Sequence, residues 1–148
     1  MSVKISNLDV NLRFNNKRVI SACVKQMIAD KCEKKLGDIS VVFCSDEQIL
    51  ETNNTYLNHN YYTDIITFDY CDDTHISGDL LISIDTVKLN AKDYGVTFLN
   101  ELHRVILHGV LHLLGQKDKS DKDFKKMKQL EDQYLLLLSQ LLSAKNEI

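Results

Sequence analysis

Residues 97–115 form the segment that most limits how this chain can fold. They read TFLNELHRVILHGVLHLLG, and apolar residues such as Val110, Leu111, Leu113 and Leu114 lie on almost every side of the helix they would form. A helix that is apolar all round is buried inside a protein rather than lying on its surface. The remaining segments must therefore supply the elements that cover it.

Those segments supply strands first and helices later. The order β-α-β-α-β-β-α-α-α predicts an α+β fold, with a mixed sheet of about four strands packed with helices. In the first half of the chain, we expect a strand over 3–9, a helix over 16–37 that Gly37 ends, a strand over 38–45, and a helix that Ser45 caps and that runs from Asp46 to about Leu57. Paired strands over 64–70 and 78–84 follow. The remaining elements are a helix from Asp85 to Gly95, the helix that begins at Thr97 or Asn100 and ends at Gly115, and a last helix from about Ser120 into the 140s.

Composition is that of an ordinary globular protein. The chain has 148 residues, of which 44% are hydrophobic and 26% charged, with five glycines and no proline. A chain of this size can bury a full core without disulfides or metals. No linker or repeat interrupts it, so we expect one domain over residues 1–148.

The cysteines and the N-terminal segment point to the cytoplasm. Cys23, Cys32, Cys44 and Cys71 form no C-x-x-C pair, so buried free thiols are the simplest interpretation. The first ten residues resemble no signal peptide, and no stretch has the length of a membrane span. A net charge of −3 and a pI of about 5.9 argue against a general nucleic-acid binder but allow a local basic face.

The stretch 108–118, HGVLHLLGQKD, has the spacing of a metal site on a late helix. His108 and His112 are four residues apart, which places their Cβ atoms about 5–6 Å apart on one face. Gly115 suits a left-handed helix end, after which the chain can return Asp118 to the same ion. Two histidines and a carboxylate leave one position open, as catalytic zinc sites do. The alternative is a pair of core histidines satisfied by hydrogen bonds.

The same stretch parallels the H-E-x-x-H signature of zinc peptidases but lacks its base. Gly109 occupies the position of the glutamate that serves as general base, so peptidase chemistry of that type is not expected. A metal-bound water could still act as the nucleophile, because zinc lowers its pKa to about 7. Gly109 also costs a helix about 1 kcal/mol relative to alanine, which is easier to explain if another element packs closely there.

Three sequence blocks together resemble the YbeY family of rRNA maturation factors. HGVLHLLG, preceded by ELHRV, is similar to the family's histidine signature, TDIITF at 63–68 to its T-D-V-L-S-F segment, and SGDLLIS at 77–83 to its G-D-I-x-I-S segment. The resemblance implies a zinc-dependent endoribonuclease with one ion per chain that cuts single-stranded RNA. It further implies work in rRNA processing at the 3′ end of small-subunit rRNA and in ribosome quality control, with rRNA and the small ribosomal subunit as partners. The ligands carried over are His108, His112 and the residue at 118.

Two positions depart from the family pattern. The family motif ends G-Y-D-H, whereas Asp118 here supplies a carboxylate. This shorter ligand must come closer, and its charge makes the metal a weaker Lewis acid. Many members carry an arginine in Y-R-G-x-D-x-P-T, and Leu57 occupies its place here. Another cation must then stabilise the phosphate charge, or turnover is slow.

Candidate helpers of the metal-bound water are His59, Asp64 and Asp79. His59, in the loop before the TDIITF block, could replace the missing cation or be an ordinary exposed loop residue. Asp79 could hold a ligand histidine or merely end a turn. His103 lies about 140° around the helix from His108 and should face away.

A lysine-rich segment, KDKSDKDFKKMK at 117–128, follows the presumed metal site. It could bind RNA phosphates, or it could be a solvated helix face with ion pairs. The lysines that would bind RNA are Lys117, Lys119, Lys122, Lys125 and Lys126.

Two other features allow more than one interpretation. Tyr61 and Tyr62 could stack on bases or pack in the core. The apolar run at 134–143 is too short to cross a bilayer. It could cover the sheet or its neighbours, or offer a surface to a protein partner.

Two rival functions stay open from the sequence. One is a metal hydrolase of another substrate class, such as a peptidase, which the absence of a glutamate at 109 disfavours. The other is a non-catalytic, zinc-containing ribosome assembly factor, which the missing arginine and the altered ligand favour.

Overall fold

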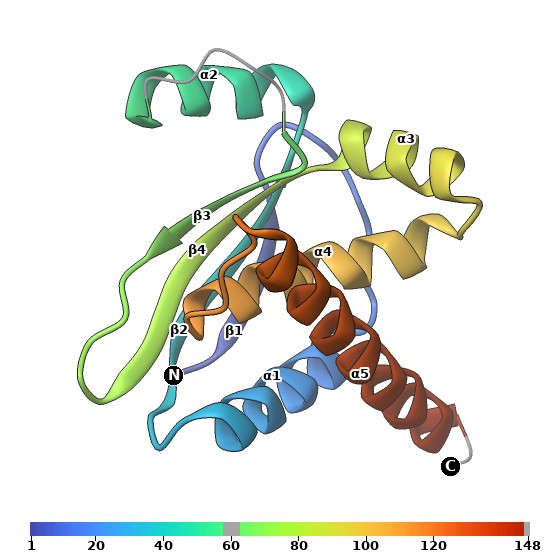
Figure 1. Ribbon diagram of the computed structural model, residues 1–148. Helices are drawn as coiled ribbons and strands as arrows, with labels where there is room; N and C mark the ends of the chain where they lie inside the picture. Colours follow the sequence, from blue (N-terminus) through green and yellow to red (C-terminus); the bar gives the residue numbers. More distant parts are fainter. Residues whose placement is uncertain (58–62, 147–148) are drawn as a thin grey trace.

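Residues 1–57 and 63–146, which the computed structural model describes, contain a four-stranded sheet (Figure 1). Its strands are Val3–Asn7 (β1), Lys35–Cys44 (β2), Ile65–Asp69 (β3) and His75–Ser83 (β4), in the spatial order β1-β2-β4-β3. β1 and β4 both run parallel to β2, whereas β3 is antiparallel to β4. The sheet is therefore mixed, and β3 and β4 form the expected hairpin.

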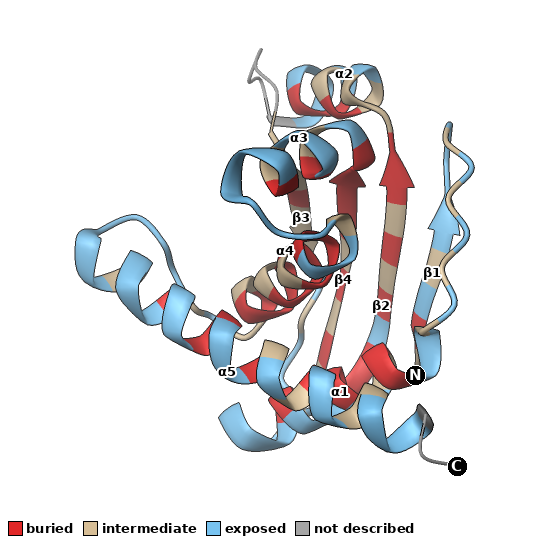
Figure 2. Cartoon of the chain, turned by 90° about the vertical axis from the view of Figure 1, so that its right-hand side faces the viewer, coloured by how far each residue is buried: buried red, intermediate tan, exposed pale blue. Residues whose placement is uncertain are grey.

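The helices fall on the two faces of this sheet unequally (Figures 1 and 2). They are Lys17–Lys31 (α1), Asp46–Leu57 (α2), Ile84–Tyr94 (α3), Phe98–Leu113 (α4) and Asp121–Asn146 (α5). α1 and α4 pack on one face of the sheet, and α5 packs against these two helices. On the other face, Ile49 of α2 packs against Ile66 and Leu81. The predicted α+β class and element order are confirmed.

The helix α4 lies at the centre of the larger core, as its apolar sequence requires. Gly109 explains how it comes so close to the sheet. A Cβ atom at this position would lie 2.8 Å from Cδ1 of Ile65 and 2.9 Å from Cδ2 of Leu80. Of the two predicted starts, Thr97 is the cap, since its hydroxyl accepts from the amide of Asn100 at 3.1 Å. The close packing that we expected at Gly109 is therefore present.

The apolar run at 134–143 packs within the molecule. Tyr134 and Leu138 are buried in the main core, and the hydroxyl of Tyr134 donates to Oδ2 of Asp30 on α1 at 2.8 Å. Leu136 is 60% exposed. The run covers α1, and a protein partner at this helix stays a prediction.

The predicted boundary at Gly37 is wrong. α1 ends at Lys31, and Gly37 lies inside β2, which begins at Lys35 rather than at 38. A Cβ atom on Gly37 would lie 2.0 Å from Oγ of Ser77, and the pairing with β4 shifts register between Leu36 and Ile39. The glycine therefore allows two strands to approach at an irregular point, instead of ending a helix. β4 likewise begins at His75, three residues earlier than expected.

Ser83, not Asp85, caps α3. The Ser83 hydroxyl accepts from the amide of Thr86 at 3.2 Å, whereas the Asp85 carboxylate accepts from the amide of Asp46 at 2.9 Å. Asp85 therefore serves the first turn of the neighbouring helix α2. The glycines predicted at the ends of α3 and α4 do lie there. Gly95 and Gly115 take the left-handed backbone, with φ angles of 67° and 92°.

All four cysteines are free thiols, as predicted, but only Cys23 and Cys44 are buried, whereas Cys32 and Cys71 are partly exposed. Burial raises the pKa of Cys23 to about 11 and that of Cys44 to about 12. Neither is a reactive thiolate near neutral pH. Within the described ranges, none of the helices combines the length and apolar character that a membrane crossing needs.

Candidate metal centre

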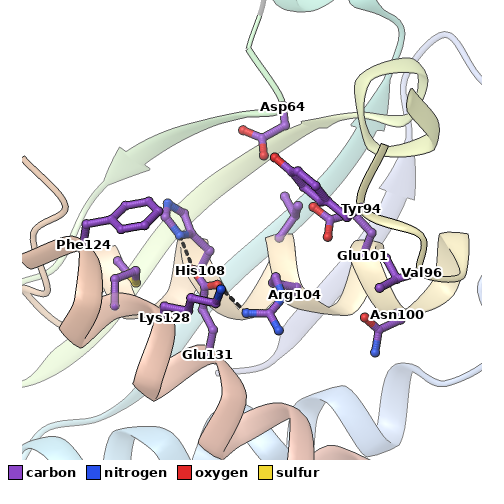
Figure 3. A pocket seen from close by; sticks show the side chains of 12 residues that line it. Asp64, Tyr94, Val96, Asn100, Glu101, Arg104, His108, Phe124, Lys128 and Glu131 are labelled. Atoms are coloured by element: carbon purple, nitrogen blue, oxygen red, sulfur yellow. Dashed lines mark hydrogen bonds and ion pairs between the residues drawn. The ribbon is translucent and has the colours of Figure 1, made fainter. Parts of the chain in front are cut away.

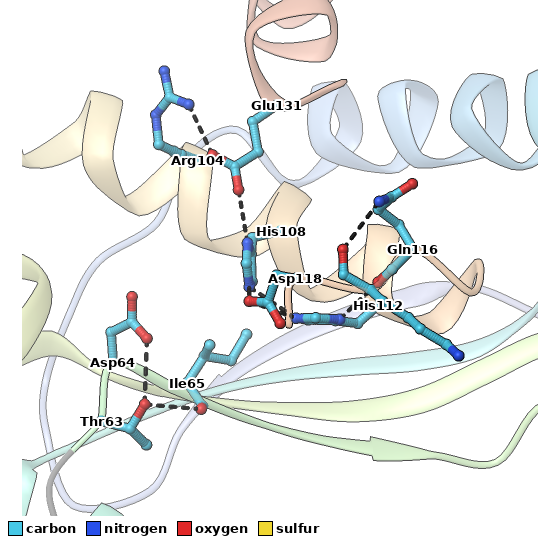
Figure 4. A network of polar contacts seen from close by, with 10 residues as sticks. Thr63, Asp64, Ile65, Arg104, His108, His112, Gln116, Asp118 and Glu131 are labelled. Atoms are coloured by element: carbon cyan, nitrogen blue, oxygen red, sulfur yellow. Dashed lines mark hydrogen bonds and ion pairs between the residues drawn. The ribbon is translucent and has the colours of Figure 1, made fainter. Parts of the chain in front are cut away.

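His108 and His112 aim their Nε2 atoms at one point, and Asp118 faces the same point (Figure 4). The two Nε2 atoms are 2.9 Å apart, and Oδ2 of Asp118 lies 3.5 Å from that of His108 and 3.6 Å from that of His112. In a tetrahedron with zinc–nitrogen distances of about 2.0–2.1 Å, ligand atoms lie roughly 3.3 Å apart. Among the described residues, these three form the one group of side chains that could hold a metal ion.

The end of α4 brings the shorter carboxylate within reach. The helix stops at Leu113, and Gly115 takes the left-handed backbone while its amide bonds to the carbonyl of His112 at 3.0 Å. The amide of Gln116 bonds back to the carbonyl of Leu111 at 3.0 Å. This tight reversal returns the chain over the last turn, so Asp118 reaches the two histidines.

The Nδ1 atoms of both histidines are engaged elsewhere. Nδ1 of His112 donates to the carbonyl of Gln116 at 2.9 Å, and Nδ1 of His108 lies 2.7 Å from Oε2 of Glu131. With a proton on each Nδ1, both Nε2 atoms present lone pairs to one another, an arrangement that a shared cation would stabilise. The donor set therefore fits a metal ion.

The electrostatics of the two histidines differ. Burial lowers the pKa of His108, but the hydrogen bond and charge of Glu131 outweigh it, so the pKa lies above its ordinary value. Burial lowers the pKa of His112, and the charge of His108 lowers it further. Glu131 thus makes His108 the more basic of the two.

Glu131 belongs to a charged network that joins α4 to α5. Its Oε1 accepts from Nη1 of Arg104 at 2.8 Å, and Nη2 of Arg104 bonds to Asp132 at 2.6 Å. Sequence reasoning missed both Glu131 and Arg104. A signal was present, because Met127, Leu130 and Tyr134 place position 131 on the buried face of an amphipathic helix, where a glutamate is rarely unpaired.

A pocket of about 560 Å³ opens beside His108 (Figure 3). Its polar lining includes the carboxyl groups of Asp64 and Glu101 and the cations of Arg104 and Lys128, while Tyr94 and Phe124 line it from α3 and α5. Burial raises the pKa of Asp64, although the nearby His108 partly opposes that shift. Of the two predicted helpers that the structure describes, Asp64 and Asp79, it brings Asp64 to the site.

The other helper candidates lie elsewhere. Gly78 and Leu80 of β4 face α4, so Asp79 between them points to the opposite face of the sheet, away from the histidines. His103 faces away, as predicted, and packs edge-on against Phe14 with ring centroids 6.0 Å apart. The positions of His59, Tyr61 and Tyr62 lie outside the described residues.

The lysine-rich segment is exposed beside the three metal-binding side chains. Among the described residues, none of its lysines makes an ion pair within 4.0 Å, and both RNA binding and a solvated helix face stay predictions. Lys128 also lines the pocket. The lysines predicted to bind RNA are all exposed: Lys117, Lys119, Lys122, Lys125 and Lys126.

Comparisons with known proteins agree over most of the chain. The model of a family described as endoribonuclease YbeY matches residues 3–139. An endoribonuclease YbeY of Parabacteroides distasonis is 48% identical over 130 residues, which are 88% of this chain and 91% of that protein. The one of Bacteroides thetaiotaomicron is 45% identical over 137 residues, which are 93% and 99%. A solution structure of a Thermotoga maritima protein shares the fold, with a TM-score of 0.65 at 22% identity over 97% of this chain and 93% of that one.

Proposed function

The chain belongs to the endoribonuclease YbeY family, and we propose that it is a zinc-dependent enzyme that cuts single-stranded RNA during rRNA processing. Its substrate would be the 3′ end of small-subunit rRNA, and it would also act in ribosome quality control. The small ribosomal subunit would be its partner, which would place its work in the cytoplasm.

The convergence of His108, His112 and Asp118 carries this proposal. These three side chains would hold one zinc ion per chain and leave one coordination position free. When bound, zinc would supply Lewis acidity to a phosphate oxygen and to water. Glu131 orients His108, and the carbonyl of Gln116 orients His112, so both imidazoles keep the tautomer that a metal requires.

The pocket next to His108 supplies the other groups that cleavage of a phosphodiester needs. Asp64 has a raised pKa and lines the pocket, so it can hold a proton for the departing oxygen. Lys128 offers a cation to the phosphate, in place of the family arginine that Leu57 replaces. Arg104 is less available for this role, because Glu131 and Asp132 already bind both of its terminal nitrogens.

The other two helpers inferred from the sequence are His59 and Asp79. The part of His59 stays a prediction. Asp79 has no access to the metal side of the sheet, so we leave it out of the mechanism. A peptidase stays disfavoured, because Gly109 supplies no general base at the position of the peptidase glutamate.

The experiment that tests the proposal combines metal content with RNA cleavage. Untagged protein is purified without added metal, its zinc is measured by elemental analysis, and cleavage of single-stranded RNA and of casein is followed. We expect about one zinc per chain and cleavage of RNA alone, with both zinc and cleavage lost in a folded His112→Ala variant. Zinc without RNA cleavage would point to a non-catalytic assembly factor, and casein cleavage to a peptidase.

A further inference from the structure

Glu101 is a buried residue whose carboxyl group lines the pocket. Only 4% of the residue is exposed, and it lines the pocket beside His108 (Figure 3). Within the described part of the chain, its side chain makes no hydrogen bond and no ion pair within 4.0 Å. Burial raises its pKa, although Arg104 partly opposes that shift. Among the described residues, His103 Nε2 is the one fully buried side-chain atom without a partner, so the oxygens of Glu101 open onto the pocket and its occupant, water or a ligand, supplies their hydrogen-bond donors.

The neighbours of Glu101 exclude two kinds of ligand group at this end of the pocket. Asp64 also lines the pocket and raises the pKa of Glu101 through its charge, so a phosphate here would meet two carboxyl groups. A second metal ion is not favoured either. Among the described residues, the metal-binding group is that of His108, His112 and Asp118, and it includes neither carboxyl. A ligand group that donates hydrogen bonds and carries no negative charge suits these two carboxyl groups.

An aromatic ring stands next to this carboxyl. Tyr94 ends α3 and is 66% exposed although it lines the pocket, and Figure 3 shows its ring between Asp64 and Glu101. Phe124, on α5, is 62% exposed and lies at the His108 end. Exposed rings on two helices that face one pocket are typical of proteins that stack unpaired bases.

We propose that this pocket binds one unpaired guanine of the RNA, which stacks on Tyr94 and donates its N1–H and N2–H to the carboxylate of Glu101. Guanine is the RNA base whose Watson–Crick edge presents two adjacent N–H donors, and a carboxylate accepts both. Glu101 and His108 are seven residues apart on α4, which is about 10 Å along a helix. The base would therefore belong to a nucleotide close to the phosphate at the metal site. The inference rests on the proposed function and names a base preference within it.

The test uses nucleoside monophosphates, which have no phosphodiester bond to cut, so that binding is measured separately from cleavage. Zinc-loaded protein is titrated with the monophosphates of guanosine, inosine, 7-deazaguanosine, adenosine, cytidine and uridine, and amide chemical shifts over 94–104 are followed. We expect guanosine to bind at least tenfold more tightly than adenosine, cytidine or uridine. Inosine lacks the N2 donor and should lose about tenfold, whereas 7-deazaguanosine keeps the same edge and should stay within twofold.

Variants then assign the contacts. Glu101→Gln exchanges one acceptor for a donor, which matches adenine better, so the ratio of guanosine to adenosine affinity should fall at least tenfold. Tyr94→Ala should weaken all the monophosphates, and Tyr94→Phe should stay within twofold of wild type. Tyr70→Ala is the matched control, because Tyr70 is 60% exposed outside the pocket. Thermal unfolding checks that each variant is folded.

The outcomes separate this inference from the proposed function. Equal binding of all the bases, or an unchanged affinity ratio in folded Glu101→Gln, would overturn the guanine site even if the protein cuts RNA. If guanosine monophosphate binds in a way that depends on Glu101 but the protein cuts no RNA, the guanine site is upheld and the proposed nuclease activity is rejected.

Discussion

Glu131 lies between His108 and Arg104: its Oε2 is 2.7 Å from Nδ1 of His108 and its Oε1 is 2.8 Å from Nη1 of Arg104. Only 8% of Glu131 is exposed, so water competes little with either contact of its carboxylate. The imidazole of His108 is therefore held by α5, although it is carried by α4.

Glu131→Gln should weaken zinc binding about 10- to 100-fold, because carboxylates that orient metal-binding histidines contribute this much. Competition with a zinc chelator measures the affinity. Asp132→Asn is the matched control, since Asp132 binds the same Arg104 but is exposed and does not touch His108. Equal loss in both variants would mean that the Arg104 network, rather than the contact with His108, sets the affinity.

Asp118→Ala should lower zinc affinity more than tenfold, whereas Asp118→His should retain one zinc per chain. The alanine removes one of three converging ligand atoms. The imidazole can replace it, because histidine is an equally good zinc ligand. Elemental analysis after dialysis gives both results, and full zinc content in Asp118→Ala would show that the carboxylate is not a ligand.

Gly78→Ala should destabilise the fold by about 1–3 kcal/mol, the usual cost of overpacking. Its Cβ would lie 2.5 Å from the backbone oxygen of Phe68, which cannot move without disturbing the pairing of β3 with β4. Gly109→Ala meets only side-chain ends and gains about 1 kcal/mol of helix propensity. Urea unfolding should therefore rank Gly78→Ala as the more destabilised. The reverse order would contradict these contacts.

His103 should make the protein sensitive to acid. Burial lowers its folded-state pKa to about 4 from the ordinary 6.5, so the unfolded chain binds the proton first as pH falls. Stability is then lost between pH 6.5 and about 4, by about 2–3 kcal/mol at pH 4.5. Urea unfolding of wild type and His103→Leu at pH 7.5 and 4.5, both with chelator, isolates the effect. If the difference in unfolding free energy between wild type and His103→Leu is the same at both pH values, His103 is not the source of the acid sensitivity.

Lys122→Glu together with Lys125→Glu should weaken RNA binding and reduce its salt dependence, by about one unit of the log–log slope for each lost phosphate contact. Both lysines are exposed on α5 near the metal centre. Lys25→Glu on α1 with Lys31→Glu makes the same change in charge elsewhere on the surface and serves as control. If wild type and both double variants have the same salt slope, the lysine-rich segment does not contact the RNA.

The convergence of the three candidate ligands could be predicted because they lie close together in the sequence. A helical spacing of four and a glycine turn already bring His108, His112 and Asp118 together, with no knowledge of the rest of the fold. Glu131 was missed because it comes 23 residues later, on another helix, and only the packing of α5 on α4 brings it to His108.

The errors came from positions where tertiary contacts decide the local structure. The apolar spacing before Gly37 continues past the true end of α1, and only the pairing of β2 with β4 explains why the chain is extended there. Asp79 could have been placed better, since the alternation of Gly78, Leu80 and Ile82 already directs it to the other face of the sheet.

The docking of α5 also has a consequence for the order in which the protein is made. A ribosome synthesises a chain from its N-terminus, so His108 and His112 emerge before Glu131, and before Tyr134, which ties the same helix to Asp30. The side chains proposed to hold zinc gain the support of Glu131 only when α5 packs on α4. A chain in synthesis that has not yet reached Glu131 therefore lacks the carboxylate that holds His108.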